Sequence, residues 1–235
     1  MLIIKYLQLP FHFDTARLKD AVAALENRKW QLHYQVRHYE GDWTALPLRS
    51  IDGQADNVMI SPIPGSQYAD TVFLKESPYL QEILNGFKCP LMAVRLLKLN
   101  AGSVIKEHHD AELCYEQGEI RLHIPITTHP DVAFYLDKER MPLQEGECWY
   151  MNFNLPHSII NNSNIDRVHL VIDAGVNDWV KTLFSQPNTN KKEIAASGHS
   201  DEVKKMMVAQ LRQLNTVTAT NMANEIEAGL VANRE

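Results

Sequence analysis

Apolar and polar residues alternate in short runs through the middle of this chain, which is the pattern of β-strands. The runs between residues 91 and 174 are LMAVRLLKL, SVIKEHHD, EIRLHIPI, VAFYL, ECWYMNF, HSII and RVHLVID. Turn residues separate them, among them the Asn-Ala-Gly of 100–102 and the Glu-Gly of 145–146. Short strands at this spacing predict a sandwich or jelly roll.

Helical periodicity appears on both sides of this strand region. A first helix is predicted after Asp14, a suitable N-cap, and its apolar face consists of Leu18, Ala21, Val22 and Leu25. Residues 30–63 return to short strand-like runs broken by glycine and proline. A second helix is predicted to begin at Pro78, with Ser77 as its cap, and to end near Gly86.

The chain changes character after Phe184. Residues 185–200 are polar and aperiodic, which predicts a linker or long loop. Ser200 then begins a predicted amphipathic helix, whose face includes Val203, Met206, Met207, Gln210, Leu211 and Leu214. We therefore expect a main domain over 1–184, with flanking helices on its β core, and a linker with a C-terminal helical extension over 185–235. The C-terminal helix is expected to pack on the barrel or on a second copy in a homodimer.

Composition narrows the class of protein. A chain of 235 residues with 45% hydrophobic content supports an ordinary globular core, and 29 acidic against 23 basic side chains, without a basic run, argue against nucleic acid as a partner. No stretch has the length of a membrane span, and the first 14 residues lack the layout of a secretory signal. The three cysteines, an odd number without ligand spacing, are typical of a reducing compartment. We expect a cytoplasmic protein.

The candidate chemistry begins at His108-His109-Asp110. Residues i and i+2 of a strand project from the same face, so His108 and Asp110 can reach one ion while His109 points away. His157 is the best third ligand, because Pro156 before it favours an extended backbone. Two histidines and a carboxylate on one face of a metal, with open positions opposite, are typical of non-haem iron oxygenases. Zinc would accept the same ligands and activate water instead.

Arg167 favours iron over zinc, because a buried arginine near the metal can hold a dicarboxylate co-substrate. It shares a strand face with His169 and Val171. A regular hairpin that pairs Asn161 with Arg167 would turn His157 and Arg167 toward one cavity. An internal salt bridge to a structural acid is the alternative explanation of Arg167.

A short pattern that occurs twice in the sequence indicates a polar cavity. IRLHI and DRVHL both place arginine and histidine two residues apart, as Arg121 with His123 and Arg167 with His169. The remaining isolated histidines, His12, His33, His38 and His129, are expected to be structural or exposed. The segment 43–49 could line the pocket, but a half-buried strand explains it better.

Taken together, the segments AVRLLKLNAGSVIKEHHD, EIRLHIPI, GECWYMN, LPHSII and RVHLVID resemble the aspartyl/asparaginyl β-hydroxylase superfamily of Fe(II)/2-oxoglutarate dioxygenases, and within it the L-proline cis-4-hydroxylase type. The resemblance covers residues 93–173. It implies a double-stranded β-helix (a cupin-like jelly roll) in which His108, Asp110 and His157 hold Fe(II). It further implies that Arg167 binds the distal carboxylate of 2-oxoglutarate, with Arg121, His123 and Arg95 near the co-substrate or substrate.

The resemblance also implies the reaction. A C–H bond of a free, proline-like amino acid would be hydroxylated with O2, and 2-oxoglutarate would leave as succinate and CO2. Retention of Asp110 argues against a halogenase. Two other functions stay open: β-hydroxylation of Asp or Asn residues in a peptide or protein, and a non-catalytic jelly roll that senses a metal or a small ligand.

Overall fold

The computed structural model describes residues 2–60, 65–187, 190–196 and 201–232, with side chains for all of these except 201–204 and 229–232. The predicted cap Ser200, the side chain of Val203, and Pro62 and Pro64 of the predicted strand region lie outside this description.

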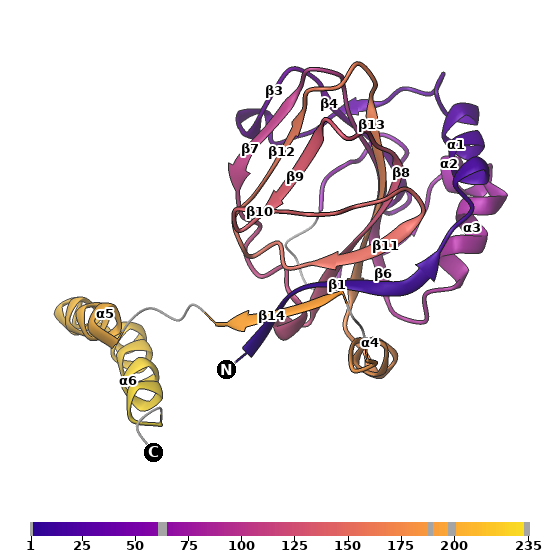
Figure 1. Ribbon diagram of the computed structural model, residues 1–235. Coiled ribbons are helices and arrows are strands. Elements are labelled where there is room, and N and C mark those ends of the chain that lie inside the picture. The colour runs from indigo at the N-terminus through magenta and orange to yellow at the C-terminus, as the bar shows by residue number, and fades with distance from the viewer. Residues whose placement is uncertain (1, 61–64, 188–189, 197–200, 233–235) are drawn as a thin grey trace. The chain divides into compact units, whose positions relative to one another are not determined.

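Two antiparallel sheets form the core (Figure 1). The larger sheet runs in the spatial order β14 (Lys191–Ala195), β1 (Leu2–His12), β11 (Glu147–Met151), β8 (Glu119–Thr127), β13 (Arg167–Gly175), β6 (Leu91–Leu99), β4 (Trp43–Ile51) and β2 (Gln31–Leu32), and β5 (Tyr68–Asp70) pairs with β4. The smaller sheet runs β10 (Glu139–Arg140), β9 (Val132–Leu136), β12 (His157–Asn161), β7 (Val104–His108) and β3 (Tyr39–Glu40). This arrangement confirms the predicted mainly β, double-stranded β-helix core.

Among the described residues before 188, the helices are short and accompany the sheets. They are α1 (Thr15–Ala24), α2 (Val72–Lys75), α3 (Pro78–Asn85) and α4 (Asp178–Phe184), with single 3-10 turns at Val36–His38 and Tyr115–Gln117. The Asp14 side chain caps α1 through the amide of Arg17, as predicted. Ser77 precedes α3 as predicted, but its hydroxyl donates to the Phe73 carbonyl and caps no amide of the helix. No helix among the described residues has the length and apolar character needed to cross a membrane.

The two faces of β13 differ in the side chains that they carry and in what they contact. Val168, Leu170 and Ile172 face the apolar layer that includes residues of α1, α3 and α4. The alternate residues of the same strand, led by Arg167 and His169, face the smaller sheet. Every residue from 167 to 174 is buried, so both faces of this strand are covered. One face is apolar, and the other carries the charged and polar side chains.

An apolar layer between the two sheets surrounds this polar block. It includes Leu97 and Leu99 of β6, Phe134 of β9, Trp149 of β11 and Ile159 of β12. Arg95 follows the same parity as Leu97 and lies opposite Val171 in the β6–β13 ladder. The polar side chains are therefore enclosed in an otherwise apolar interior, where unpaired charge is costly.

The predicted hairpin between His157 and Arg167 is wrong. His157 begins β12 in the smaller sheet, whereas Arg167 begins β13 in the larger one, and the described ladders join β12 only to β7 and β9. Asn161 fixes the segment that passes from β12 to β13, because its side-chain amide donates to the carbonyls of Leu99, Asn100 and Ile165. Consecutive strands of a jelly roll pass between sheets, so the two residues face each other across the interior instead of along one ladder.

Several elements were not predicted, among them β1, α4 and β14. The N-terminal segment forms β1, which pairs with β11, and α4 and β14 lie within or beside the segment expected to be a linker. Alternation in β1 is obscured by Lys5, whose side chain is buried against Asp137 and Glu139. A buried charge with two partners thus replaces an apolar residue on a half-buried strand.

The C-terminal part forms a compact unit of its own. Contacts divide the chain into Ile3–Ile194 and a second unit made of Ala195–Glu235 with the first two residues. In the second unit α5 (Asp201–Gln213) and α6 (Val217–Ala232) pack together, with Val208, Ala219 and Ala223 buried. Arg212 joins the helices by an ion pair to Glu227 at 2.6 Å. The predicted boundary at 184/185 stays a prediction.

Candidate metal centre

Three side chains converge where β7, β12 and the chain after β7 meet. His108 and His157 are direct partners across the β7–β12 ladder, and their ring centroids lie 4.2 Å apart. Asp110 follows β7 and is held by its backbone amide, which donates to the Phe153 carbonyl at 2.9 Å. One ligand atom from each of the three residues lies within 4.8 Å of the others. The spacing suits a single metal ion.

Backbone contacts orient both histidines. Nδ1 of His108 donates to the Lys106 carbonyl at 2.8 Å, and Nδ1 of His157 donates to the Leu155 carbonyl at 3.0 Å. A carbonyl only accepts, so each ring carries its proton on Nδ1 and has its lone pair on Nε2. Burial lowers the pKa of His157 to about 4 and also lowers that of His108. Both rings are therefore neutral near pH 7, as metal ligands must be.

Asp110 is the one acid of this cluster. Burial by itself would raise the pKa of Asp110, but the Arg121 guanidinium together with His157 and His108 outweighs burial, and the pKa lies below its usual value. Nη1 of Arg121 donates to Oδ2 of Asp110 at 2.5 Å. The carboxylate is thus ionised and ready to bind a cation. His109, which was expected to point away, is exposed.

Arg167 is the most unusual charge in the interior. It is 1% exposed, and Nη2 donates to Nδ1 of His169 at 2.8 Å. Its Nε atom has no hydrogen-bond partner, and no carboxylate in the described part of the chain forms an ion pair with it. Burial accordingly lowers the pKa of Arg167 to about 9. The expected alternative, an internal salt bridge, finds no partner among the described residues.

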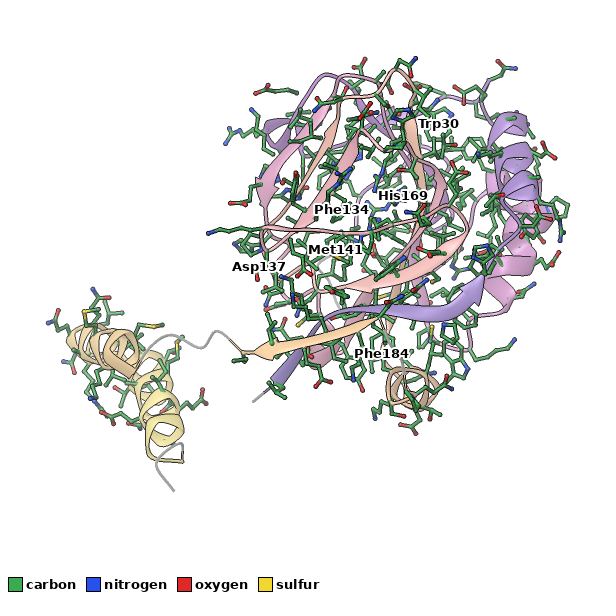
Figure 2. All side chains as sticks on the ribbon, viewed as in Figure 1. Trp30, Phe134, Asp137, Met141, His169 and Phe184 are labelled. Carbon is green, nitrogen blue, oxygen red and sulfur yellow. The ribbon has the colours of Figure 1, made fainter. Side chains whose placement is uncertain are left out.

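A short relay joins Arg167 to His123. Nδ1 of His169 accepts from Arg167, so the contact of 3.2 Å from Nδ1 of His123 requires the proton to be on His123. Nε2 of His123 is then an acceptor that is buried without a partner. Burial and the nearby arginines keep the pKa of His123 well below its usual value. The two Arg-x-His pairs therefore supply three members of one hydrogen-bonded group, Arg167, His169 and His123. Figure 2 labels His169 in the interior, together with Phe134, over whose ring the Arg167 guanidinium lies.

Arg95 and Arg121 differ from Arg167 because they have a carboxylate partner. Asp173, 3% exposed, accepts from Nε of Arg121 at 2.5 Å and from Nη2 of Arg95 at 3.2 Å. In total, three buried guanidinium groups face two carboxylates, those of Asp110 and Asp173. The interior carries an excess of positive charge before any ligand binds.

One pocket brings the predicted site residues together. It is lined by all seven of them: His108, Asp110, His157, Arg167, Arg121, His123 and Arg95. Arg49, the last residue of the segment 43–49 that could line the pocket, is not in the lining and pairs with Asp70 and Tyr68 instead.

Several lining residues were missed by sequence reasoning. His33, expected to be isolated, is buried and stacks on Trp43 with ring centroids 3.5 Å apart. Tyr34 and Gln35 line the pocket beside it, in the run 30–36 that was predicted to be a strand and of which only Gln31–Leu32 is one. Phe153 packs edge-on against His157 and lies parallel to the ring of His123. Strand parity with Trp149 could have identified Phe153.

The residues fit a divalent metal and a dicarboxylate ligand. Two imidazole Nε2 atoms and one carboxylate suit Fe(II), and the histidines and Asp110 leave the rest of the coordination sphere to other ligands. The unpaired Nε of Arg167 is a donor in a closed apolar environment, which is the arrangement that recognises a carboxylate.

Comparison with known proteins agrees with this geometry. The sequence model of the aspartyl/asparaginyl beta-hydroxylase family matches residues 14–175, and the chain belongs to this family. It is 29% identical over 164 residues to the L-proline cis-4-hydroxylase of Rhizobium meliloti (strain 1021), covering 68% of this chain and 57% of that protein. It is 28% identical over 140 residues to L-proline cis-3-hydroxylase 1 of Streptomyces sp, covering 57% and 47%. The chain thus spans about half the length of these curated relatives.

Among solved structures, an oxidoreductase of the 2OG-Fe(II) oxygenase family from Burkholderia pseudomallei is similar, with 14% identity and a TM-score of 0.49. The match covers 74% of this chain and 88% of that one.

Proposed function

We propose that this protein is an Fe(II)- and 2-oxoglutarate-dependent dioxygenase that hydroxylates a free amino acid. One observation carries the proposal: an uncompensated buried arginine, Arg167, lines the same pocket as the two histidines and the aspartate. A zinc hydrolase needs only the metal ligands, whereas a site that also holds a dicarboxylate co-substrate needs such a cation. Family membership and the similarity to proline hydroxylases support the same conclusion.

Each group of residues has a role in this proposal. His108, His157 and Asp110 would hold the metal, and Arg167 would bind the distal carboxylate of 2-oxoglutarate. Fe(II) with 2-oxoglutarate and O2 supplies the oxidising power, and succinate and CO2 are released. The chain contributes orientation, through the backbone contacts of the histidines, and exclusion of water, through apolar walls that include Phe134 and Phe153.

Charge favours a substrate that carries a carboxylate. The two positive charges of the metal and the two negative charges of 2-oxoglutarate cancel, so the excess guanidinium charge of the pocket remains. Two hydrogen-bond donors of the pocket lining have no partner: Nε of Arg95 and Nε1 of Trp43. Both residues line the pocket, and they lie on the adjacent strands β6 and β4. The ladder sets Trp43 opposite Leu99 and Arg95 opposite Pro47, four residues apart, so we assign the substrate carboxylate to Arg95 alone.

The test is aerobic incubation of the purified protein with Fe(II), 2-oxoglutarate and single amino acids, starting with L-proline. We expect succinate to form and the amino acid to gain the mass of one oxygen atom. Omission of Fe(II) or of oxygen should stop both. Succinate without any oxidised acceptor across the amino acids would contradict the substrate class, and activity that persists without oxygen would contradict the reaction.

A second candidate, hydroxylation of Asp or Asn in a peptide, is favoured by a wider groove. The groove shares Tyr34, Asp110 and Arg121 with the pocket and continues along residues 65–68, 90–92 and 111–113, where the residues that flank an Asp or Asn in a peptide could lie. Short peptides that contain Asp or Asn therefore belong in the same screen. Oxidation of peptides alone would favour this candidate over a free amino acid.

Substitution of Arg95 tests the carboxylate assignment. We expect Arg95→Gln to raise the KM for the amino acid by about 10–100-fold, because a charge-assisted bond worth about 1.5–3 kcal/mol is lost. The KM for 2-oxoglutarate should change far less. Arg49→Gln is the matched control, since Arg49 pairs with Asp70 outside the pocket lining. Equal increases in both KM values would show that Arg95 does not act on the substrate carboxylate.

Location and assembly are further proposals. We propose a cytoplasmic enzyme, supported by three cysteines that are all free. We also propose that the C-terminal helices mediate a homodimer, supported by the exposed apolar residues Met206, Leu214, Val217 and Met222. Light scattering on the full chain would measure the mass: a monomer at all concentrations would contradict the dimer.

A further inference from the structure

Arg121 spans two carboxylates. Its Nε and Nη2 atoms donate to Asp173 at 2.5 and 3.2 Å, and its Nη1 atom donates to Asp110 at 2.5 Å. One edge of the planar guanidinium is thus occupied by Asp173, while Asp110 is bound by the remaining nitrogen. Because the group is rigid and planar, fixing the first edge also fixes the direction of Nη1.

Asp173 is placed to hold the Nε–Nη2 edge of the Arg121 guanidinium. It is the direct partner of Arg121 in the β13–β8 ladder, so the strand register sets the distance between the two backbones. Its second oxygen also accepts from Nη2 of Arg95, which comes from β6 on the other side of β13. Asp173 is 3% exposed, and two cations from opposite neighbouring strands hold its carboxylate. The acid therefore has little freedom to turn.

Asp110 is the residue that this arrangement affects. Arg121 occupies its Oδ2 atom, and its Oδ1 atom lies 4.0 Å from Nε2 of His108. We infer that Asp173 is a positioning residue of the metal centre: by holding Arg121 it keeps Oδ2 of Asp110 engaged and presents Oδ1 alone toward the two histidines. This inference rests on the proposed metal site, and it concerns how one ligand of that site is aimed.

A simpler explanation of Asp173 makes an opposite prediction. If the acid only adds negative charge near the metal, removing Arg121 should strengthen cation binding, because a positive charge disappears. If Asp173 acts through Arg121, removing either residue should weaken cation binding. Removing both should then cost no more than removing one, since residues that act in series are not additive.

The experiment is a titration of the metal-free full-length protein with Co(II), without substrate or co-substrate. We expect Asp173→Asn and Arg121→Gln each to weaken Co(II) affinity by about 10–100-fold, the usual cost of losing a residue that orients a metal ligand. The double variant should fall in the same range as the single variants. Asp70→Asn is the matched control, since Asp70 pairs with Arg49 away from the pocket.

The results separate the inference from the proposed function. No Co(II) binding by the unaltered protein would overturn the metal site itself. Normal binding that Asp173→Asn leaves unchanged, tighter binding by Arg121→Gln, or additive losses in the double variant would overturn the role of Asp173 alone.

Two further measurements guard against a fold defect. The Co(II) absorption spectrum should change in Asp173→Asn at saturating metal, because Asp110 is then free to bind through both oxygens, whereas a purely structural role would leave the spectrum of the bound fraction unchanged. If Asp173→Asn does not fold, the variant Asp173→Asn with Arg95→Gln removes one charge of each sign. We expect this balanced variant to fold and still to bind Co(II) about 10–100-fold more weakly. Unchanged affinity in the balanced variant would overturn the inference.

Discussion

His108→Ala is expected to abolish Fe(II)-dependent turnover and to weaken metal binding by more than about 100-fold, beyond the usual loss for a residue that only orients a ligand. His108 supplies one of two neutral imidazoles, and its Nε2 atom is free because Nδ1 donates to Lys106. Alanine leaves one histidine and Asp110, which cannot define a face of the ion. Succinate formation and Co(II) titration are the measurements.

The neighbouring histidine provides the control. His109 is exposed and is not part of the three-residue cluster, so His109→Ala should leave Co(II) affinity within a few-fold of the unaltered protein. The thermal midpoint of His109→Ala should stay similar to that of the unaltered protein, because His109 is exposed. Persistent turnover by His108→Ala, or an equal loss in His109→Ala, would refute the assignment of His108.

Arg167→Met is expected to have two opposite effects. Binding of 2-oxoglutarate should weaken by about 150–5000-fold, because loss of one partner from a buried charge pair costs about 3–5 kcal/mol. The ligand-free protein should become more stable by about 1–4 kcal/mol, because a buried cation without a carboxylate partner is replaced by an apolar side chain of similar length. The combination distinguishes a ligand-binding arginine from a structural one.

Chemical unfolding and isothermal titration would measure the two effects separately. The titration uses 2-oxoglutarate with Co(II) in place of iron, without oxygen chemistry. Arg49→Met is the control, since Arg49 has Asp70 as its partner: it should leave 2-oxoglutarate affinity unchanged and should not stabilise the fold. A large loss of stability in Arg167→Met would instead indicate that Arg167 is needed for folding, and retained 2-oxoglutarate affinity would contradict its proposed role.

Strand parity accounts for the parts of the site that sequence alone predicted. Side chains alternate in a strand whatever lies beside it, so His108 and Asp110 could be separated from His109, and Arg121 could be grouped with His123. The same rule placed Arg167 and His169 on one face, where a hydrogen bond of 2.8 Å joins them. These relations need only a few consecutive residues.

Relations between strands were beyond the reach of the same reasoning. The hairpin proposed for His157 and Arg167 obeyed parity, yet β12 and β13 lie in different sheets. His33 reaches the pocket from the run 30–36, which was predicted to be a strand but is one only at Gln31–Leu32. Its stack on Trp43 comes from tertiary packing, which strand alternation does not reveal. Nothing in the run RVHLVID indicated that its final acid would pair with arginines of two other strands.

The amino-acid sequence by itself therefore determined the strand-rich fold class, the polar face of each strand and the residue types proposed to bind a metal and an anion. Only the tertiary structure decided which strands are neighbours, which arginine has no carboxylate partner, and which oxygen of Asp110 is free. The physical reason is that side-chain direction follows from local backbone geometry, whereas strand pairing and the balance of buried charge depend on residues far apart in the chain.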